Sequence, residues 1–153
     1  MYAVTTNTGM IVEHEASVND GVSSPVAPIS CYVQSSDFDI GDGHNYGFVW
    51  QIIPDITFDG SNTSGVTDEN PLATFTVRPR QNPGSGYGNA DTPTVQSSQS
   101  YAKQQVYNVQ KFTEIVYTRV RGRQMAFKIS SDTLGTQWQL GTPRINVRPD
   151  GRR

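Results

Sequence analysis

The chain has 153 residues, 35% of them hydrophobic, and a formal net charge of −2 at pH 7. This length fits one domain that is large enough to bury a core. The low apolar fraction, together with 14 glycines and 9 prolines, favours an all-β protein with long loops over a helical bundle. No run approaches the roughly 20 apolar residues that a membrane-spanning helix needs, and no secretory signal opens the chain. We therefore expect synthesis in the cytoplasm and no membrane partner.

Short β-branched and aromatic runs between turn-forming clusters predict strands in the N-terminal half of the chain. They cover residues 10–15, 29–34, 37–40, 46–53 and 55–58. The run 46–53 is the most apolar, so we expect a central strand there, followed by an edge strand because Pro54 cannot donate to a ladder. Cys31 is the only cysteine, and we expect it to be a small buried residue of a strand without a disulfide partner.

The same pattern continues in the C-terminal half, and Gly122 predicts a bulge or bend between two of its strands. The predicted strands cover residues 72–78, 106–109, 115–120, 125–129, 138–140 and 145–147. Residues 79–99 are rich in turn formers and predict a long loop. Short strands at this spacing predict an all-β fold, namely an antiparallel β-sandwich-like single domain over residues 1–153 with at most one short helix.

The segment DFDIGDG at residues 37–43 invites a calcium interpretation, because Ca²⁺ takes several carboxylate oxygens from one loop. The spacing does not fit. Gly41 stands where the third ligand belongs, and Phe48 stands where the bidentate glutamate belongs. We interpret the segment as a turn capped by its Asp side chains.

No arrangement of residues predicts catalysis. His14 and His44 are the only histidines, and on a strand Glu13 and Glu15 lie on the face opposite to His14. The zinc spacings HxxxH and CxxC are absent, as are a G-x-S-x-G elbow and a phosphate-binding glycine motif at a helix start. We expect no enzymatic activity, no catalytic residue, no cofactor, no metal and two surface histidines.

Charge is unevenly distributed along the chain. Residues 119–153 hold eight basic residues against two acidic ones, a local charge of +6, so residues 1–118 carry −8. Such a chain can pack acidic surface on basic surface of further copies of itself. The run 144–148 (RINVR) alternates strictly, with one apolar and one polar, basic face. The pI of about 5.6 argues against sequence-specific binding of nucleic acid.

We therefore name basic residues as candidates for contacts between subunits. They are Arg121, Arg123, Arg144, Arg148, Arg152 and Arg153. Residues 148–153 form a basic C-terminal tail in which Asp150 and Gly151 predict a turn. We expect this tail to contact a neighbouring subunit and not its own core, so deletion of residues 149–153 should leave the melting temperature nearly unchanged.

Several short motifs resemble the C-terminal part of tail tube and nozzle proteins of short-tailed bacteriophages, the tail tubular protein B type. They are FDIGDG at 38–43, IPD at 53–55, RGRQM at 121–125, QLG at 139–141 and RPDGRR at 148–153. None of them is catalytic. Because members of this family are usually longer, we expect the chain to be either the C-terminal segment of a larger nozzle protein or a separately encoded version of that domain.

The resemblance implies a non-enzymatic structural protein of the virion tail, assembled in the host cytoplasm. It implies a ring, commonly a hexamer, around the channel through which DNA leaves. The implied partners are other copies of the chain, further tail, adaptor or portal proteins, and passing genomic DNA bound without sequence specificity.

A carbohydrate- or receptor-binding β-sandwich of a phage tail is the alternative. In that case Trp50, Trp138, Tyr46 and Tyr87 would stack on sugar rings. Such a module needs its aromatic side chains exposed together on one face. Trp50 lies in the most apolar run and Trp138 alternates with Leu140, so we expect both in the core.

Overall fold

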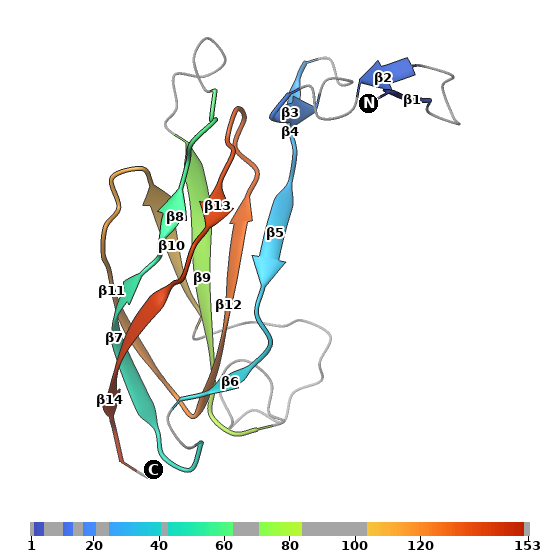
Figure 1. Ribbon diagram of the computed structural model, residues 1–153. Helices are drawn as coiled ribbons and strands as arrows, with labels where there is room; N and C mark the ends of the chain where they lie inside the picture. The colour runs from blue at the N-terminus through green and yellow to red at the C-terminus, as the bar shows by residue number, and fades with distance from the viewer. Residues whose placement is uncertain are drawn as a thin grey trace.

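The computed structural model of the chain (Figure 1) describes residues 2–4, 11–13, 17–20, 25–40, 43–62, 71–83 and 104–151. All regular elements in these ranges are β-strands, and all strand pairs are antiparallel. The predicted all-β, antiparallel fold is therefore confirmed. The strands are β1 (Tyr2–Val4), β2 (Ile11–Glu13), β3 (Asn19–Asp20), β4 (Ala27–Pro28), β5 (Cys31–Gln34), β6 (Phe38–Asp39), β7 (Gly47–Ile53), β8 (Ile56–Thr57), β9 (Leu72–Arg80), β10 (Gln105–Gln110), β11 (Val116–Gly122), β12 (Gln124–Ser131), β13 (Gln139–Leu140) and β14 (Arg144–Pro149).

Two sheets form the body of the domain. One has the order β10-β9-β12-β5, with β6 also paired to β12, and the other has the order β11-β7-β14. Figure 1 shows the second sheet along one side of the body, and β12 and β5 along the other. The pairs β8–β13, β3–β4 and β1–β2 are short, and β1–β2 lies apart from the two main sheets. As predicted, the apolar run at 46–53 contains a strand that is central in its sheet, β7.

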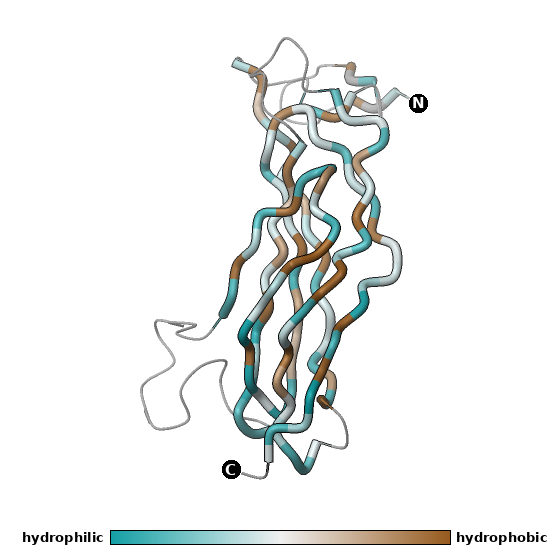
Figure 2. Tube along the Cα trace, turned by 90° about the vertical axis from the view of Figure 1, so that its left-hand side faces the viewer, coloured by the Kyte–Doolittle hydropathy of each residue, from teal (hydrophilic) through white to brown (hydrophobic). Residues whose placement is uncertain are grey.

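The core lies between these sheets and is supplied by alternate residues of their strands. Val49 and Ile52 of β7 are 0% and 1% exposed, and Val120 of β11 is 2% exposed. Val77 of β9 and Ile129 of β12 are both 0% exposed and belong to the same apolar cluster. Burial contributes about 1.5–3 kcal/mol for each large side chain, so this shared cluster holds the two sheets together in a sandwich-like arrangement. Brown and teal alternate along these strands in Figure 2, the period-two pattern of half-buried strands.

The chain changes sheets at Gly122 and Arg123. β11 ends where Gly122 pairs with Gly47, and β12 begins where Gln124 pairs with Arg80. The Arg123 N–H donates to the Arg80 carbonyl oxygen at 2.9 Å, and a Cβ on residue 122 would lie 2.9 Å from that oxygen. Gly122 is therefore the bend of a corner between two sheets and not a bulge within one long strand.

A second junction separates β7 from β8 and β13 from β14. Pro54 ends β7, as predicted, and Asp55 follows with a φ of 50°. The Gly141 N–H donates to the Asp55 carbonyl oxygen at 2.8 Å, and the Thr142 N–H donates to the Asp55 carboxylate at 2.5 Å. These bonds hold Asp55 in a left-handed conformation that a non-glycine residue seldom adopts. A Cβ on residue 141 would collide with the Asp55 carboxylate, which explains the glycine.

Two predicted boundaries are wrong. Residues 79 and 80 belong to β9 and not to the loop 79–99, because Pro79 and Arg80 pair with the start of β12. Residues 148 and 149 belong to β14 and not to a tail. Residues 84–99 of the predicted loop, and the last two residues of the chain, lie outside the described ranges.

Candidate interaction surface on the three-stranded sheet

The outward side of the sheet β11-β7-β14 gathers arginine and aromatic side chains. On β7, Val49 and Ile52 point into the core, so the residues beside them point outward. On β11 the buried and exposed residues alternate without interruption. We call the outward set the arginine–aromatic face; it comprises Phe48, Trp50, Gln51, Ile53, Tyr117, Arg119, Arg121, Arg144, Asn146 and Arg148.

The strand register arranges this face in rows. Phe48 of β7 has Arg121 of β11 on one side and Arg148 of β14 on the other. In the next regular row, Gln51 lies between Tyr117 and Asn146. The Asn146 amide donates to Gln51 Oε1 at 2.6 Å, which places both side chains on the same face. A central strip of aromatic and amide side chains is therefore flanked by arginines on both neighbouring strands.

Trp50 occupies an irregular position within this strip. The register of β14 passes directly from Asn146 opposite Gln51 to Val147 opposite Val49. Trp50 has no Cα partner in β14, which makes it the extra residue of a β-bulge. A bulge of this kind reverses the alternation between core and solvent, and the burial pattern of β7 changes phase at this point. The predicted core position of Trp50 is therefore wrong: its indole is half-buried on the outward face.

Guanidinium groups cover the aromatic rings of the face. The Arg148 Cζ lies 4.9 Å from the centroid of the Trp50 ring. At the corner end of the sheet, Arg121 and Arg123 lie over Tyr46, with Cζ-to-centroid distances of 4.2 Å and 4.9 Å. Stacking fixes the plane of a guanidinium group while its N–H edge stays available, and this edge matches carboxylate and phosphate oxygens. The face thus presents cationic donors in fixed orientations.

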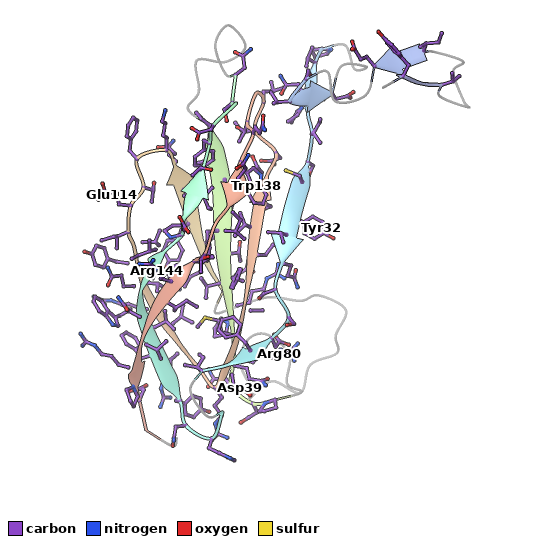
Figure 3. All side chains as sticks on the ribbon, in the orientation of Figure 1. Tyr32, Asp39, Arg80, Glu114, Trp138 and Arg144 are labelled. Carbon is purple, nitrogen blue, oxygen red and sulfur yellow. The ribbon has the colours of Figure 1, made fainter. Side chains whose placement is uncertain are left out.

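The face carries a net positive charge. Arg121 donates from Nε to the Asp150 carboxylate and from Nη2 to the Asp150 carbonyl oxygen, so this arginine is engaged within the domain. Arg119, Arg144 and Arg148 are exposed, and within the described ranges no acidic side chain forms an ion pair with any of them. Figure 3 shows Arg144 on this side of the body, with Tyr32 on the opposite side.

The structure brings four of the six predicted contact residues together, and the other two lie outside the described ranges. Arg121, Arg144 and Arg148 lie on the face, and Arg123 lies at its corner end over Tyr46. Arg152 and Arg153 fall outside the described residues. The sequence reasoning missed Arg119, although the alternation Tyr117, Arg119, Arg121 contains the signal that would have placed it there.

The prediction that the C-terminal tail contacts only a neighbour is corrected for residues 149–151. Pro149 pairs with Gly47, the Asp150 N–H donates to the Tyr46 carbonyl oxygen at 2.8 Å, and the Tyr46 N–H donates to the Gly151 carbonyl oxygen at 2.8 Å. These residues extend the ladder between β14 and the start of β7. Deletion of residues 149–153 should therefore lower the stability of the isolated domain.

In the calcium-like segment, residues 37–43, two carboxylates bind other residues of the domain. Asp37 forms an ion pair with Arg80 at 3.1 Å, and Asp39 accepts a hydrogen bond from Gln124 Nε2 at 2.8 Å. The two carboxylates therefore contact side chains of neighbouring strands, whereas the sequence predicted local caps. Asp42 lies outside the described residues.

His44 is exposed, as predicted, and His14 is outside the described ranges. In the part of the chain that the structure describes, no group of three or more His, Cys, Asp or Glu residues is arranged to hold a metal ion, and no helix is long and apolar enough to cross a membrane.

The four aromatic residues of the sugar-binding alternative do not meet on one face. Trp138 is half-buried against the core, and its Nε1 donates to Cys31 Sγ at 3.2 Å. Trp50 lies on the arginine–aromatic face and Tyr46 at its corner end, while Tyr87 is outside the described residues. Cys31 is half-buried at the start of β5, less buried than predicted.

The motifs that carry the phage resemblance contact one another. Phe38 and Asp39 pair with Met125 and Gln124, and the Ile40 N–H donates to the Arg123 carbonyl oxygen at 2.8 Å. The IPD and QLG motifs meet at the Asp55–Gly141 junction, and RGRQM meets RPDG through Arg121 and Asp150. These motifs therefore build the two junctions of the domain.

The sequence matches no model of a protein family, and no curated protein sequence matches it.

Proposed function

We propose that this chain is a non-enzymatic structural component of a bacteriophage tail, a nozzle or tube protein that assembles as a ring, commonly sixfold, around the DNA exit channel. The observation that carries the proposal is the arginine–aromatic face, which has the composition of a contact surface: exposed arginines beside Trp50 and Tyr117 on a sheet held by a buried core. The phage resemblance of the junction motifs supports the tail assignment.

Self-assembly is the first property to test. The purified chain should form a discrete oligomer by native mass spectrometry, and negative-stain electron microscopy should show rings with a central opening. Salt should weaken this oligomer between about 50 mM and about 200 mM, because exposed ionic contacts are screened over this range. A chain that stays monomeric at all concentrations and salts would argue against a ring-forming tail protein.

A sugar-binding module of a phage tail is the second candidate, and one observation favours it. Tyr117 is 70% exposed beside the hydrogen-bonded amides of Gln51 and Asn146, a combination of ring and amide groups that can contact a sugar. On a glycan array, Tyr117→Ala should then lose binding. Tyr32→Ala is the matched control, because Tyr32 is 68% exposed on the other side of the domain.

A further inference from the structure

The composition of the arginine–aromatic face indicates a protein partner. All of its basic residues are arginines, and none of the strands β7, β11 and β14 contains a lysine. Arginine, tryptophan and tyrosine are the residues that dominate binding energy at protein interfaces, whereas lysine is depleted there. Because Arg148 already covers the Trp50 ring, that ring offers little free surface for stacking with a nucleotide base.

The opposite charge lies at one end of the domain. β7 and β8 run from the corner at Gly122 toward Asp59, and β12 runs from the same corner toward Asp132. The turn after Asp59 and the loop after Asp132 are joined, since the Asn62 N–H donates to the Gly135 carbonyl oxygen at 2.8 Å. Figure 1 shows the tips of β8 and β12 at the end of the body away from the C-terminus.

This acidic end, defined by Asp59 and Asp132, is available for contact. Both residues are exposed, and no basic side chain within the described ranges forms an ion pair with either. Lys111 and Glu114, between β10 and β11, also lie toward this end and offset each other in charge. The domain thus carries a basic surface on one side and a smaller acidic surface at one end.

A contact between two different surfaces of the same chain is heterologous, and repeating it generates rings or open filaments. Matched face-to-face contact of two arginine–aromatic faces would instead place like charges against each other, which costs free energy. We propose that the arginine–aromatic face of one copy packs against the acidic end of the next copy, with Arg119 and Arg144 facing Asp59 and Asp132. This inference rests on the proposed function, since it assigns the subunit contact of the ring.

A charge-swap experiment on the full chain tests the pairing. The face variant carries Arg119→Glu and Arg144→Glu, and the end variant carries Asp59→Lys and Asp132→Lys. All four residues are exposed, so both variants should keep the circular dichroism spectrum and melting temperature of the wild type. The controls are Lys128→Glu, on the outer side of the five-stranded sheet, and Glu13→Lys on β2.

Each swapped variant alone should be monomeric in sedimentation velocity, with a dissociation constant about tenfold higher or more. An equimolar mixture of the two should regain the oligomer, because each acidified face then meets a basic end and each native face meets a native end. Both control variants should assemble like the wild type. This restoration in the mixture is the result that supports the inference.

Four other results overturn it, and they are distinguishable. A wild-type chain that never associates overturns the proposed function and the inference with it. A wild-type oligomer that is unaffected by both swaps, or a mixture that fails to restore assembly, overturns the inference alone. If the face variant keeps its assembly but loses binding of duplex DNA in a gel-shift assay, the partner of the face is nucleic acid and not a second copy.

Discussion

The two main sheets obey the same alternation but differ in what they present to solvent. The outward side of β11-β7-β14 carries arginines around an aromatic strip. The outward side of the five-stranded sheet mixes hydroxyl and amide groups with Lys128 and with two arginines, Arg78 and Arg80, which bond to Gln34 and Asp37. In its middle strands, Thr74 pairs with Ser130 and Thr76 with Lys128. Inward positions are alike because one core serves both sheets. Core packing therefore constrains mainly the inward side of each sheet. The outward sides are less constrained by it, so their different side chains can serve contacts with other molecules.

The largest expected effect is a difference in stability between substitutions on the two sides of β7. Ile52 is 1% exposed in the core, and its neighbour Ile53 lies on the outward side. Ile52→Ala should lower the free energy of unfolding by about 2–5 kcal/mol, because it removes buried methyl groups and leaves a cavity. Ile53→Ala is the matched control and should cost clearly less. Chemical denaturation of both variants measures the difference, and equal costs would show that the inward and outward assignment of β7 is wrong.

The corner between the sheets should give the next effect. Gly122→Ala places a Cβ 2.9 Å from the Arg80 carbonyl oxygen, which accepts the Arg123 N–H. Because backbone atoms on both sides must move, we expect a loss of about 1–3 kcal/mol in the free energy of unfolding. Gly151→Ala is a control without steric conflict, since a Cβ there meets nothing within 4 Å, although its φ of 77° still disfavours alanine. A Gly122→Ala variant as stable as wild type would show that the corner is loosely packed.

Sequence reasoning predicted elements with a regular period and failed where distant segments decide. The alternation of 144–148 correctly gave the outward Arg144 and Arg148 and the inward Ile145. Trp50 was misplaced, because its local apolar run says nothing of the bulge that arises only from pairing with β14. At Gly122 the predicted bulge or bend is a bend, as one of the two alternatives had it, but that it joins two sheets depends on Arg80, which lies far away in the sequence. Arg119 differs from these cases, because the alternation of Tyr117, Arg119 and Arg121 is a local signal that is sufficient to predict its outward position.

A smaller expected effect tests whether the aromatic rings of the face hold its arginine side chains in position through cation–π contacts. Arg148 lies 4.9 Å from the Trp50 ring, and Lys128 lies 4.5 Å from the Tyr32 ring on the other sheet. A double-mutant cycle with Arg148→Ala and Trp50→Ala should give a coupling of about 0.5–1 kcal/mol, as expected for an exposed cation–π pair. The cycle with Lys128→Ala and Tyr32→Ala should give less, because tyrosine is a weaker partner than tryptophan. Equal or absent couplings would mean that stacking does not distinguish the two faces.

The smallest expected effect concerns the ion pair at the corner end of the face. Arg121 and Asp150 are each 43% exposed, so solvent and salt screen their attraction. Asp150→Asn should cost about 0.2–1 kcal/mol at low salt and less at high salt, with thermal unfolding as the measurement. The same substitution removes the carboxylate charge beside Arg121 and so adds one positive charge to this end of the face, while the bond from Arg121 to the Asp150 carbonyl oxygen can remain. If the face contacts acidic surface, Asp150→Asn should therefore strengthen assembly while slightly weakening the fold, a combination that a purely structural ion pair would not produce. Arg121→Gln is the matched control: it breaks the same pair but removes the cation, so assembly should weaken together with stability.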